Sequence, residues 1–311
     1  MKRDLISILD LTSHEIVEIL LSAQELKKTK EPKNTLRGKV LGMVFQKPST
    51  RTRVSFEVAM YQLGGYALFL NVQDLQLSRG EAIRDTAKTL SRYVDGMVVR
   101  AYQHQDVVEL AKESAVPVIN GLSDLLHPCQ VLADIFTIAE KKGILSHLSS
   151  KELSNTEIAF VGDGNNVANS WINGAARLGM KLVICTPPGY EPDRKVLGEA
   201  EKLAKASGAD IKVSHKPEEA VKEAGVIYTD VWVSMGKEKE RQKRLKVFKP
   251  YQVNGRLIGK AKKDVLVMHC LPAHRGEEIT DEVLDGPNSI VFDQAENRLH
   301  VQKAILEFLL G

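Results

Sequence analysis

The sequence is poor in the features that mark several protein classes. It has 3 cysteines, Cys129, Cys185 and Cys270, an odd number without a Cys-x-x-Cys pair, which argues against a disulfide framework and favours a reducing compartment. No stretch approaches the roughly 20 apolar residues that span a bilayer, and residues 1–10 lack the apolar core of a signal peptide. The 43 basic and 40 acidic residues nearly cancel, unlike the charge of a nucleic-acid binder. We therefore expect a cytoplasmic protein without a membrane or nucleic-acid partner.

What the chain does contain is enough apolar sequence for a large core. Of its 311 residues 43% are hydrophobic, and the length predicts about two domains. A capping box, Thr12 with Glu15 three positions later, opens the first predicted helix. After it, short apolar runs that predict strands alternate with helical patterns such as residues 81–93, which indicates a parallel sheet with helices on its faces. The predicted strands are residues 40–45, 67–70, 97–99, 117–119, 158–161, 182–185, 211–213, 226–228 and 265–268.

A polar stretch, residues 143–155, interrupts this alternation and separates two similar halves. The sequence thus predicts an α/β fold with two doubly wound parallel-sheet domains, over residues 1–142 and 150–294. The last segment, residues 295–311, has the pattern of a helix, and we expect it to pack back on the first domain.

Polar and reactive residues gather directly after the predicted strands. Ligands bind at the carboxyl ends of strands in open parallel sheets, because these ends share one edge. With three such loops in each half, the sequence predicts one site in the cleft between the domains. The loops are residues 49–53, Arg100, 127–130, 163–166, 230–236 and 269–272.

Residues 49–53, Ser-Thr-Arg-Thr-Arg, stand between a predicted strand and a predicted helix. Free backbone N–H groups, the helix dipole, hydroxyl groups and a guanidinium all favour a phosphate at such a position. The alternative is a serine N-cap followed by exposed arginines, but Arg100 at a neighbouring strand end favours anion binding. The segment is no nucleotide P-loop, because the G-x-x-x-x-G-K-[ST] pattern is missing.

The sequence also suggests a dinucleotide site and a zinc site, and it supports each of them less well than the anion site. Residues 162–166, Gly-Asp-Gly-Asn-Asn, resemble a dinucleotide-binding turn, but the third glycine is missing and no acidic residue ends the next strand. A zinc site could use His127, Cys129, His269 and Cys270. We expect the adjacent His269 and Cys270 to point apart in an extended chain, so we predict neither a cofactor nor a metal.

Several conspicuous residues have a simpler structural interpretation. Cys185 ends a strand and is predicted to lie in the core, and Trp171 and Trp232 are predicted to be packing residues. Residues 237–249 are dense in lysine, arginine and glutamate, which could suggest RNA binding. The mixed signs of these charges favour a solvated helix or a mobile loop instead.

Four motifs together resemble the ornithine carbamoyltransferase family, in order and spacing, across nearly the whole chain. They are Ser-Thr-Arg-Thr-Arg at 49–53, His-Pro-Cys-Gln at 127–130, Asp-x-x-x-Ser-Met-Gly at 230–236 and His-Cys-Leu-Pro at 269–272. The first two are similar in all carbamoyltransferases, including the aspartate enzyme, whereas the last two are specific to the ornithine enzyme.

The resemblance implies transfer of the carbamoyl group of carbamoyl phosphate to the δ-amine of L-ornithine, giving citrulline and phosphate, in arginine biosynthesis or, in reverse, arginine catabolism. It implies no cofactor. The residues that match the family's catalytic groups are Arg51, Arg100, His127 and Cys270. The full carbamoyl phosphate set is Ser49, Thr50, Arg51, Thr52, Gln76, Arg100, His127, Pro128, Cys129, Gln130, Cys270, Leu271 and Arg298, and the ornithine set is Asn166, Asp230, Ser234 and Met235.

Two structural features come with the resemblance. Gln76 matches a residue that the family contributes to the site of an adjacent subunit, which implies a homotrimer or a multiple of trimers. The peptide bond between Leu271 and Pro272 is expected to be cis, which proline allows at low cost.

Two other functions remain open at this point. A sibling enzyme could act on aspartate, putrescine or an acylated ornithine, although the motifs at 230–236 and 269–272 favour ornithine. A non-catalytic carbamoyl phosphate-binding regulator would not need the catalytic set named above.

Overall fold

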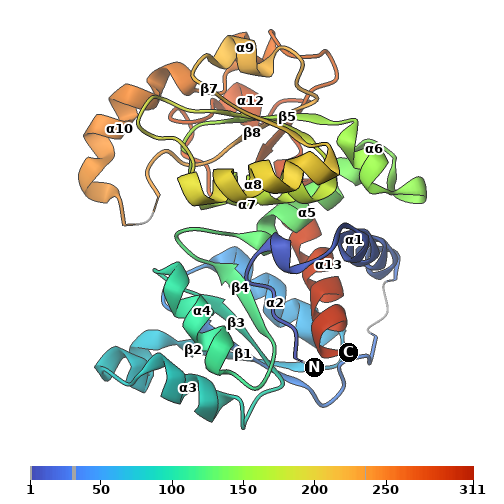
Figure 1. Cartoon of the computed structure of the whole chain (residues 1–311), viewed down its shortest axis with the longest axis vertical. Helices are drawn as coiled ribbons and strands as arrows, with labels where there is room; N and C mark the ends of the chain where they lie inside the picture. The colour runs from blue at the N-terminus through green and yellow to red at the C-terminus, as the bar shows by residue number, and fades with distance from the viewer. Residues whose placement is uncertain (1, 30–32, 235) are drawn as a thin grey trace. The chain divides into compact units, whose positions relative to one another are not determined.

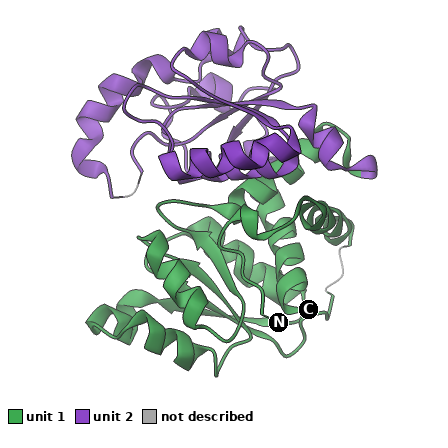
Figure 2. Ribbon diagram, viewed as in Figure 1, with its two compact units in different colours: residues 1–145, 296–311 green, residues 146–295 purple. Residues whose placement is uncertain are grey.

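The computed structural model describes residues 2–29, 33–234 and 236–311 (Figure 1). The chain divides into two compact units (Figure 2). Unit 1 comprises residues 1–145 and 296–311, and unit 2 comprises residues 146–295. Among the helices of the described ranges, none is both long and apolar enough to cross a membrane.

Unit 1 is built on a four-stranded sheet with the order β2-β1-β3-β4, in which every strand pair is parallel. Its strands are β1 (Val40–Phe45), β2 (Tyr66–Asn71), β3 (Gly96–Arg100) and β4 (Val118–Leu122). Its helices are α1 (Ser13–Lys28), α2 (Thr50–Gln62), α3 (Ile83–Leu90), α4 (His104–Glu113) and α5 (Pro128–Lys141), together with the residues from Glu296 onward of α13 (Val291–Leu310).

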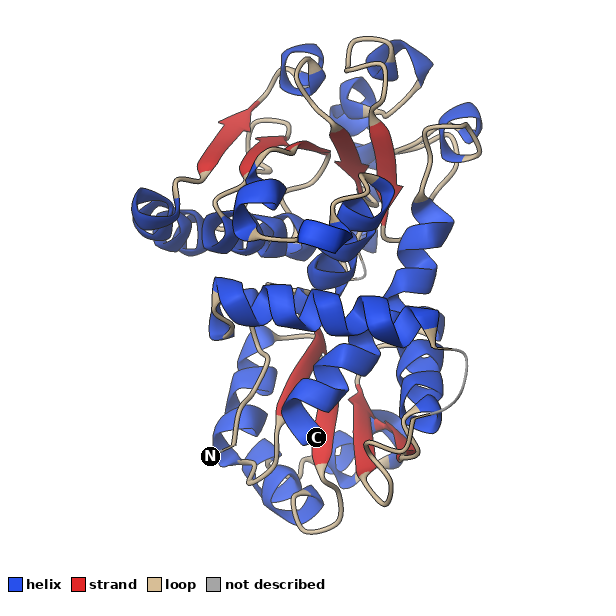
Figure 3. Ribbon diagram, turned by 90° about the vertical axis from the view of Figure 1, so that its right-hand side faces the viewer, coloured by secondary structure: helices blue, strands red, loops and turns tan. Residues whose placement is uncertain are grey.

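Unit 2 is built on a five-stranded sheet with the order β7-β6-β5-β8-β9, and its strand pairs are parallel as well. Figure 3 shows the strands of each sheet flanked by helices. The strands are β5 (Glu157–Val161), β6 (Lys181–Cys185), β7 (Asp210–Ser214), β8 (Val226–Thr229) and β9 (Leu266–His269). The helices are α6 (Ser150–Ser154), α7 (Asn166–Leu178), α8 (Arg194–Ser207), α9 (Pro217–Val221), α10 (Arg241–Phe248), α11 (Gly255–Ile258) and α12 (Asp281–Leu284).

The predicted alternation of strands and helices is confirmed, and the strands found differ from the predicted runs by at most three residues at either end, the largest difference being at the end of β4. The capping box is confirmed too. The Thr12 hydroxyl accepts a hydrogen bond from the backbone N–H of Glu15, and the Glu15 carboxylate accepts one from the backbone N–H of Thr12. The apolar face of α1, with Ile16, Ile19, Leu20 and Ala23, is buried.

Each unit has its own apolar core. In unit 1, strands β3 and β4 share a buried cluster with α3 and α4, made of Ala87, Met97, Val99, Val107, Leu110 and Val118. In unit 2, strands β5, β8 and β9 share a buried cluster with α9, α11 and α12, which includes Val161, Val221, Ile227, Leu257, Val267 and Val283. Cys185 belongs to the second cluster, and Trp171 and Trp232 are buried, so their predicted packing roles are confirmed.

Gly164 lies in the turn that joins β5 to α7, where two backbone segments come very close. A Cβ atom at Gly164 would lie 2.4 Å from the backbone nitrogen of Pro192 and 2.6 Å from the carbonyl oxygen of Tyr190. The Gly164 backbone N–H also donates to that same carbonyl. The glycine of this turn therefore serves close chain packing, which accounts for its presence without a nucleotide.

Replacing Gly164 with alanine should destabilise the chain by about 1–3 kcal/mol, because a backbone neighbour cannot yield as a side chain can. Urea unfolding followed by circular dichroism measures this change. Gly198→Ala is the matched control, since a Cβ at this position in α8 meets nothing within 4 Å. That substitution should instead stabilise the chain by about 0.5–1 kcal/mol, as expected for Gly→Ala in a helix. Equal effects of the two substitutions would contradict the close packing at Gly164.

Candidate active site

The anion-binding segment of unit 1 forms the start of α2. Ser49 is the N-cap residue, and its hydroxyl accepts a hydrogen bond from the backbone N–H of Thr52. The two arginines of the segment have different surroundings. Arg53 lies over the Phe69 ring at 3.7 Å and pairs with Glu57 at 3.0 Å, whereas Arg51 occupies the first turn of the helix. The helix start and Arg51 thus provide the features that a phosphate needs.

Arg298 connects two predicted substrate residues within unit 1. Its guanidinium donates to the Thr52 hydroxyl at 2.8 Å and to the Gln130 side-chain oxygen at 2.9 Å. The Gln130 amide nitrogen in turn donates to Asp134 at 2.8 Å. All four side chains are buried, so each hydrogen bond forms where water does not compete. This Thr52–Arg298–Gln130–Asp134 chain fixes the Gln130 amide relative to the start of α2.

Arg100 and His127 add two further buried polar groups. Arg100 is the last residue of β3, where the register with β4 shifts, and His127 is the N-cap residue of α5. Burial lowers the pKa of His127 well below its usual 6.5, and the positive charges of Arg298 and Arg100 lower it further. His127 is therefore neutral at physiological pH, so it can donate or accept a hydrogen bond there without carrying charge.

Three predicted residues of unit 1 have other surroundings. Pro128 is the first residue of α5, and Cys129 is buried, with its thiol 3.5 Å from the carbonyl oxygen of Asn120. Burial raises the pKa of Cys129 to about 12, so this cysteine remains a thiol. Gln76 begins the short 3₁₀ helix Gln76–Arg79, and its side chain is exposed. Among these three, Gln76 alone has an exposed side chain.

In unit 2, Asp230 follows β8 and receives several hydrogen bonds although it is only 6% exposed. Its carboxylate accepts from the Cys270 thiol at 3.0 Å, from the Asn165 amide at 2.7 Å and from the backbone N–H of Val231 at 2.8 Å. All three donors that the described residues offer to this carboxylate are neutral. A cation placed beside it would supply the counter-charge that a buried carboxylate requires.

Asn165 is a site residue that sequence reasoning missed in favour of its neighbour Asn166. Its side-chain oxygen caps α7 by accepting from the backbone N–H groups of Val167 and Ala168, which leaves its amide nitrogen free to reach Asp230. An asparagine between a strand and a helix is a typical N-cap, and that signal could have identified it. Ser234 is partly buried in the loop after Asp230, and Met235 lies outside the described residues.

Arg244 is a second residue that the sequence did not single out. The segment 237–249 forms α10 with short 3₁₀ turns at either end, and the prediction of a solvated helix is wrong at this position, because Arg244 is 2% exposed. Its guanidinium donates to Asp163 at 2.9 Å and to the carbonyl oxygen of Trp232 at 2.7 Å. Arg244 thus ties α10 to the loops that follow β5 and β8.

The chain after β9 carries Cys270 and Leu271. The peptide bond between Leu271 and Pro272 is cis, which confirms the expectation, and Leu271 has a positive φ of 57°. The expectation that His269 and Cys270 point apart is wrong, since possible ligand atoms of Asp230, His269 and Cys270 all lie within 4.8 Å of one another. Strand β9 ends at His269, so the strand alternation of side chains does not extend to Cys270.

These positions do not favour the zinc alternative. The His269 Nδ1 atom accepts a hydrogen bond from the backbone N–H of Leu271, and its Nε2 atom faces Glu278 at 3.1 Å. Both ring nitrogens are therefore occupied, whereas a zinc ligand must offer a free lone pair. The Cys129 thiol, with its high pKa, is an equally poor ligand, because zinc binds the thiolate.

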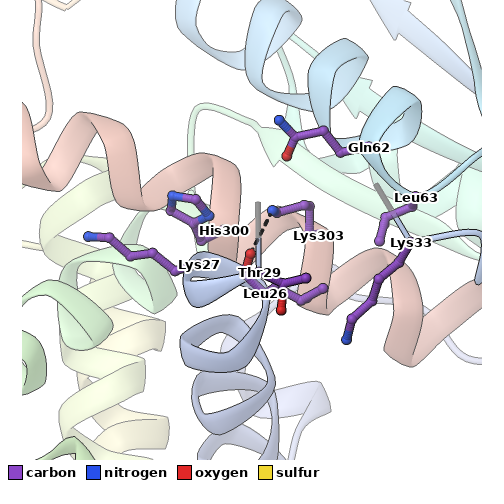
Figure 4. Close-up of a pocket in the computed structure, with 8 residues that line it drawn as sticks. All are labelled: Leu26, Lys27, Thr29, Lys33, Gln62, Leu63, His300 and Lys303. Atoms are coloured by element: carbon purple, nitrogen blue, oxygen red, sulfur yellow. Dashed lines mark hydrogen bonds between the residues drawn. The ribbon is translucent and has the colours of Figure 1, made fainter. Parts of the chain in front are cut away.

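A cavity of about 250 Å³ in unit 1 lies apart from all the predicted substrate residues. Figure 4 shows it between the end of α1, the end of α2 and α13. Of the lysines that line it, Lys27 pairs with Glu140 at 2.8 Å and Lys303 donates to the carbonyl oxygen of Leu26 at 3.0 Å. We assign this cavity no ligand.

Comparison with known proteins identifies the family. The model of the aspartate/ornithine carbamoyltransferase carbamoyl-P binding domain matches residues 3–140, and the model of the Asp/Orn binding domain matches residues 154–309. The chain belongs to the aspartate/ornithine carbamoyltransferase family.

Full-length members of this family are similar to the chain along its whole length. The ornithine carbamoyltransferase of Thermococcus kodakarensis is 56% identical, covering 99% of this chain and 96% of the relative, and that of Pyrococcus abyssi is 57% identical with the same coverage. The solved structure of the ornithine carbamoyltransferase from Pyrococcus furiosus matches with a TM-score of 0.93 at 56% identity, covering 99% of this chain and 97% of that one.

The lowered pKa of His127 predicts a pH-dependent stability. Below about pH 6.5 the histidine takes up a proton in the unfolded chain but not in the folded one, so the free energy of unfolding falls as the pH falls, by up to about 1.4 kcal/mol per pH unit. His127→Gln should reduce that slope by a similar amount in urea unfolding measured between pH 7 and 5 (roughly the range in which histidine titrates). His14→Gln, whose side chain is 80% exposed, is the control and should leave the slope unchanged. An unchanged slope in the His127 variant would mean that this histidine is not held neutral.

Proposed function

We propose that the chain is an ornithine carbamoyltransferase, which transfers the carbamoyl group of carbamoyl phosphate to the δ-amine of L-ornithine and releases citrulline and phosphate. Family membership supports the chemistry of the donor, because one of its two matched domains is described as carbamoyl-P binding. The relatives that are 56–57% identical over nearly the full chain carry the same name. A cytoplasmic location is part of the proposal, and the three free cysteines are consistent with a reducing compartment.

The environment of the Asp230 carboxylate is the observation that supports ornithine as the acceptor. It is almost fully buried, and its hydrogen bonds come from a thiol, an amide and a backbone N–H group, none of which is charged. Ornithine brings an ammonium group that can pair with such a carboxylate. Aspartate brings a second carboxylate, which a like charge would repel. The environment of Asp230 thus favours ornithine over the other acceptor named in the family description.

On the donor side, the start of α2 binds the phosphate through Ser49, Thr50, Arg51 and Thr52. Attack on the carbamoyl carbon places negative charge on the carbonyl oxygen, and donors aimed at that oxygen lower the barrier. Arg51, Arg100 and the neutral His127 take this role in the proposal. Gln130 orients the carbamoyl NH₂ group, and its fixed place in the Arg298 chain makes it suitable for that task. The remaining residues of the proposed carbamoyl phosphate site are Pro128, Cys129 and Arg298.

On the acceptor side, Asp230 anchors the α-ammonium group while Asn166, Ser234 and Met235 hold the α-carboxylate. The δ-amine must lose a proton before it attacks, because a free amine of this type has a pKa near 10. Cys270 stands beside Asp230, with its thiol hydrogen bonded to the carboxylate, so the pair can orient the amine and receive its proton. Leu271, next in the chain, completes the contact with both substrates.

The choice of acceptor can be measured directly with the purified protein and carbamoyl phosphate. The value of kcat/KM for ornithine should exceed that for aspartate, putrescine or N-acetylornithine by about 10³ or more, since a site built to pair a buried polar group strongly rejects analogues that leave it unpaired. Asp230→Asn should remove most of the preference. Comparable use of aspartate or putrescine would contradict the proposed acceptor, and absence of any carbamoylated product would favour a binding protein without catalysis.

A homotrimer, alone or within a larger assembly, is also part of the proposal. The exposed side chain of Gln76 supports it, because this residue matches a family group that enters the site of an adjacent subunit. In this arrangement each site combines Arg51 of one subunit with Gln76 of the next.

Mixed trimers provide the test. Arg51→Met and Gln76→Ala should each lower kcat, by about 10²–10³ for the lost arginine. When the two inactive variants are co-expressed in equal amounts, random assembly should give about a quarter of the sites both native groups and thus about a quarter of the wild-type activity. Mixing the purified proteins without reassembly is the control and should restore nothing. No activity in co-expressed trimers would contradict the shared site.

A further inference from the structure

Glu278 and His269 form a buried pair at the end of β9. Both side chains are 0% exposed, and the His269 Nε2 atom lies 3.1 Å from Glu278 Oε1. The same carboxylate oxygen accepts a hydrogen bond from the backbone N–H of His274. Glu278 therefore joins the end of a core strand to the turn that follows the Leu271–Pro272 bond.

The hydrogen bonds of His269 determine which of its nitrogens carries a proton. The backbone N–H of Leu271 donates to Nδ1 at 2.8 Å, so Nδ1 must offer its lone pair. The proton then resides on Nε2 and is donated to Glu278. Without an acceptor at Glu278, this buried N–H would lack a partner, and the ring would gain by rotating toward another acceptor. Such a rotation removes the hydrogen bond to Leu271.

The Leu271 amide belongs to the turn that presents Cys270. The Cys270 thiol is hydrogen bonded to Asp230 at 3.0 Å, and Leu271 has the left-handed conformation that bulky residues rarely adopt. The hydrogen bond from Leu271 to His269 helps to hold that conformation. A continuous series of contacts thus runs from Glu278 through His269 and the Leu271 amide to the turn bearing Cys270.

We propose that Glu278 is a positioning residue for the acceptor side of the site: it holds the ring of His269 in place, and through it the turn that places Cys270 against Asp230. This inference rests on the proposed function for its catalytic consequence, but not for its structural one. Glu278 acts by accepting a hydrogen bond at the right distance, so its negative charge is not required.

The reactivity of Cys270 measures the position of this turn without any assay of catalysis. Cys129 and Cys185 are buried and have pKa values raised to about 12, so a thiol reagent at neutral pH reports Cys270 in the folded protein. Glu278→Met removes the acceptor at similar volume. It should speed iodoacetamide alkylation of Cys270, followed by mass spectrometry, about tenfold or more as the turn loosens. The value of kcat/KM for ornithine should fall by a similar factor.

Conservative variants of Glu278 distinguish a positioning role from an effect of its charge or of its packing. Glu278→Gln keeps an oxygen for His269 and should stay within about threefold of the wild type in both assays. Glu278→Asp keeps the charge but is one methylene shorter, so it should behave like Glu278→Met. Glu199→Gln removes an exposed carboxylate on α8, away from this turn in sequence, and is the control that should change neither assay. Equal behaviour of the Gln and Asp variants would overturn the proposal, even if the Met variant does not fold.

A double-mutant cycle tests whether Glu278 acts through His269. In His269→Asn the new side-chain oxygen can take the place of Nδ1 and accept from Leu271, but it does not depend on Glu278. Adding Glu278→Met to this variant should then change the alkylation rate less than about twofold. A full tenfold effect in that background would show that Glu278 acts without His269, through its hydrogen bond from His274 or by filling the core, and the inference would be lost.

The two proposals fail in different ways. If the wild-type protein forms no citrulline, the proposed function is wrong, while the alkylation rates still decide the role of Glu278. If citrulline forms but Glu278→Met alkylates and turns over like the wild type, the positioning role is wrong and the function stands.

Discussion

Parallel strand pairing is the constraint on which the chemistry of this chain depends. Because every strand pair in both sheets is parallel, the carboxyl ends of the strands in each unit meet at one edge. Residues far apart in sequence thereby become neighbours, as Asn165, Asp230 and Cys270 do in unit 2. The backbone there is free to turn, so it can present charged and polar side chains that a strand interior could not accommodate.

Polar groups at such an edge are buried, and each of them needs a hydrogen-bond or ion-pair partner. Arg298 satisfies Thr52 and Gln130, Arg244 balances Asp163, and Glu278 satisfies His269. Burial by itself raises the pKa of Asp163, and the guanidinium of Arg244 opposes that effect. Breaking one member of such a pair is costly because the other stays buried. The supporting residues are therefore as firmly required as the groups that touch substrate.

The elements of the fold could be predicted from sequence because their signals are local. Apolar runs gave the strands, and the pairing of Thr12 with Glu15 gave the start of α1. Supporting residues such as Arg244 and Glu278 could not be found in this way. Arg244 is one charge in a charged segment, and nothing nearby in sequence indicates that Asp163, 81 residues away, takes it into the interior. The expectation for His269 and Cys270 is wrong because it requires a strand that continues through both residues, whereas β9 ends at His269.

The position of Arg298 in the chain has a consequence for biosynthesis. Residues 1–145 are made first, then all of unit 2, and only afterwards the segment of α13 that bears this arginine. Until that segment leaves the ribosome, Thr52 and Gln130 lack the guanidinium that joins them. Unit 2 is contiguous in sequence and can fold while synthesis continues, whereas unit 1 must wait for the ribosome to reach α13 before its buried polar network is complete.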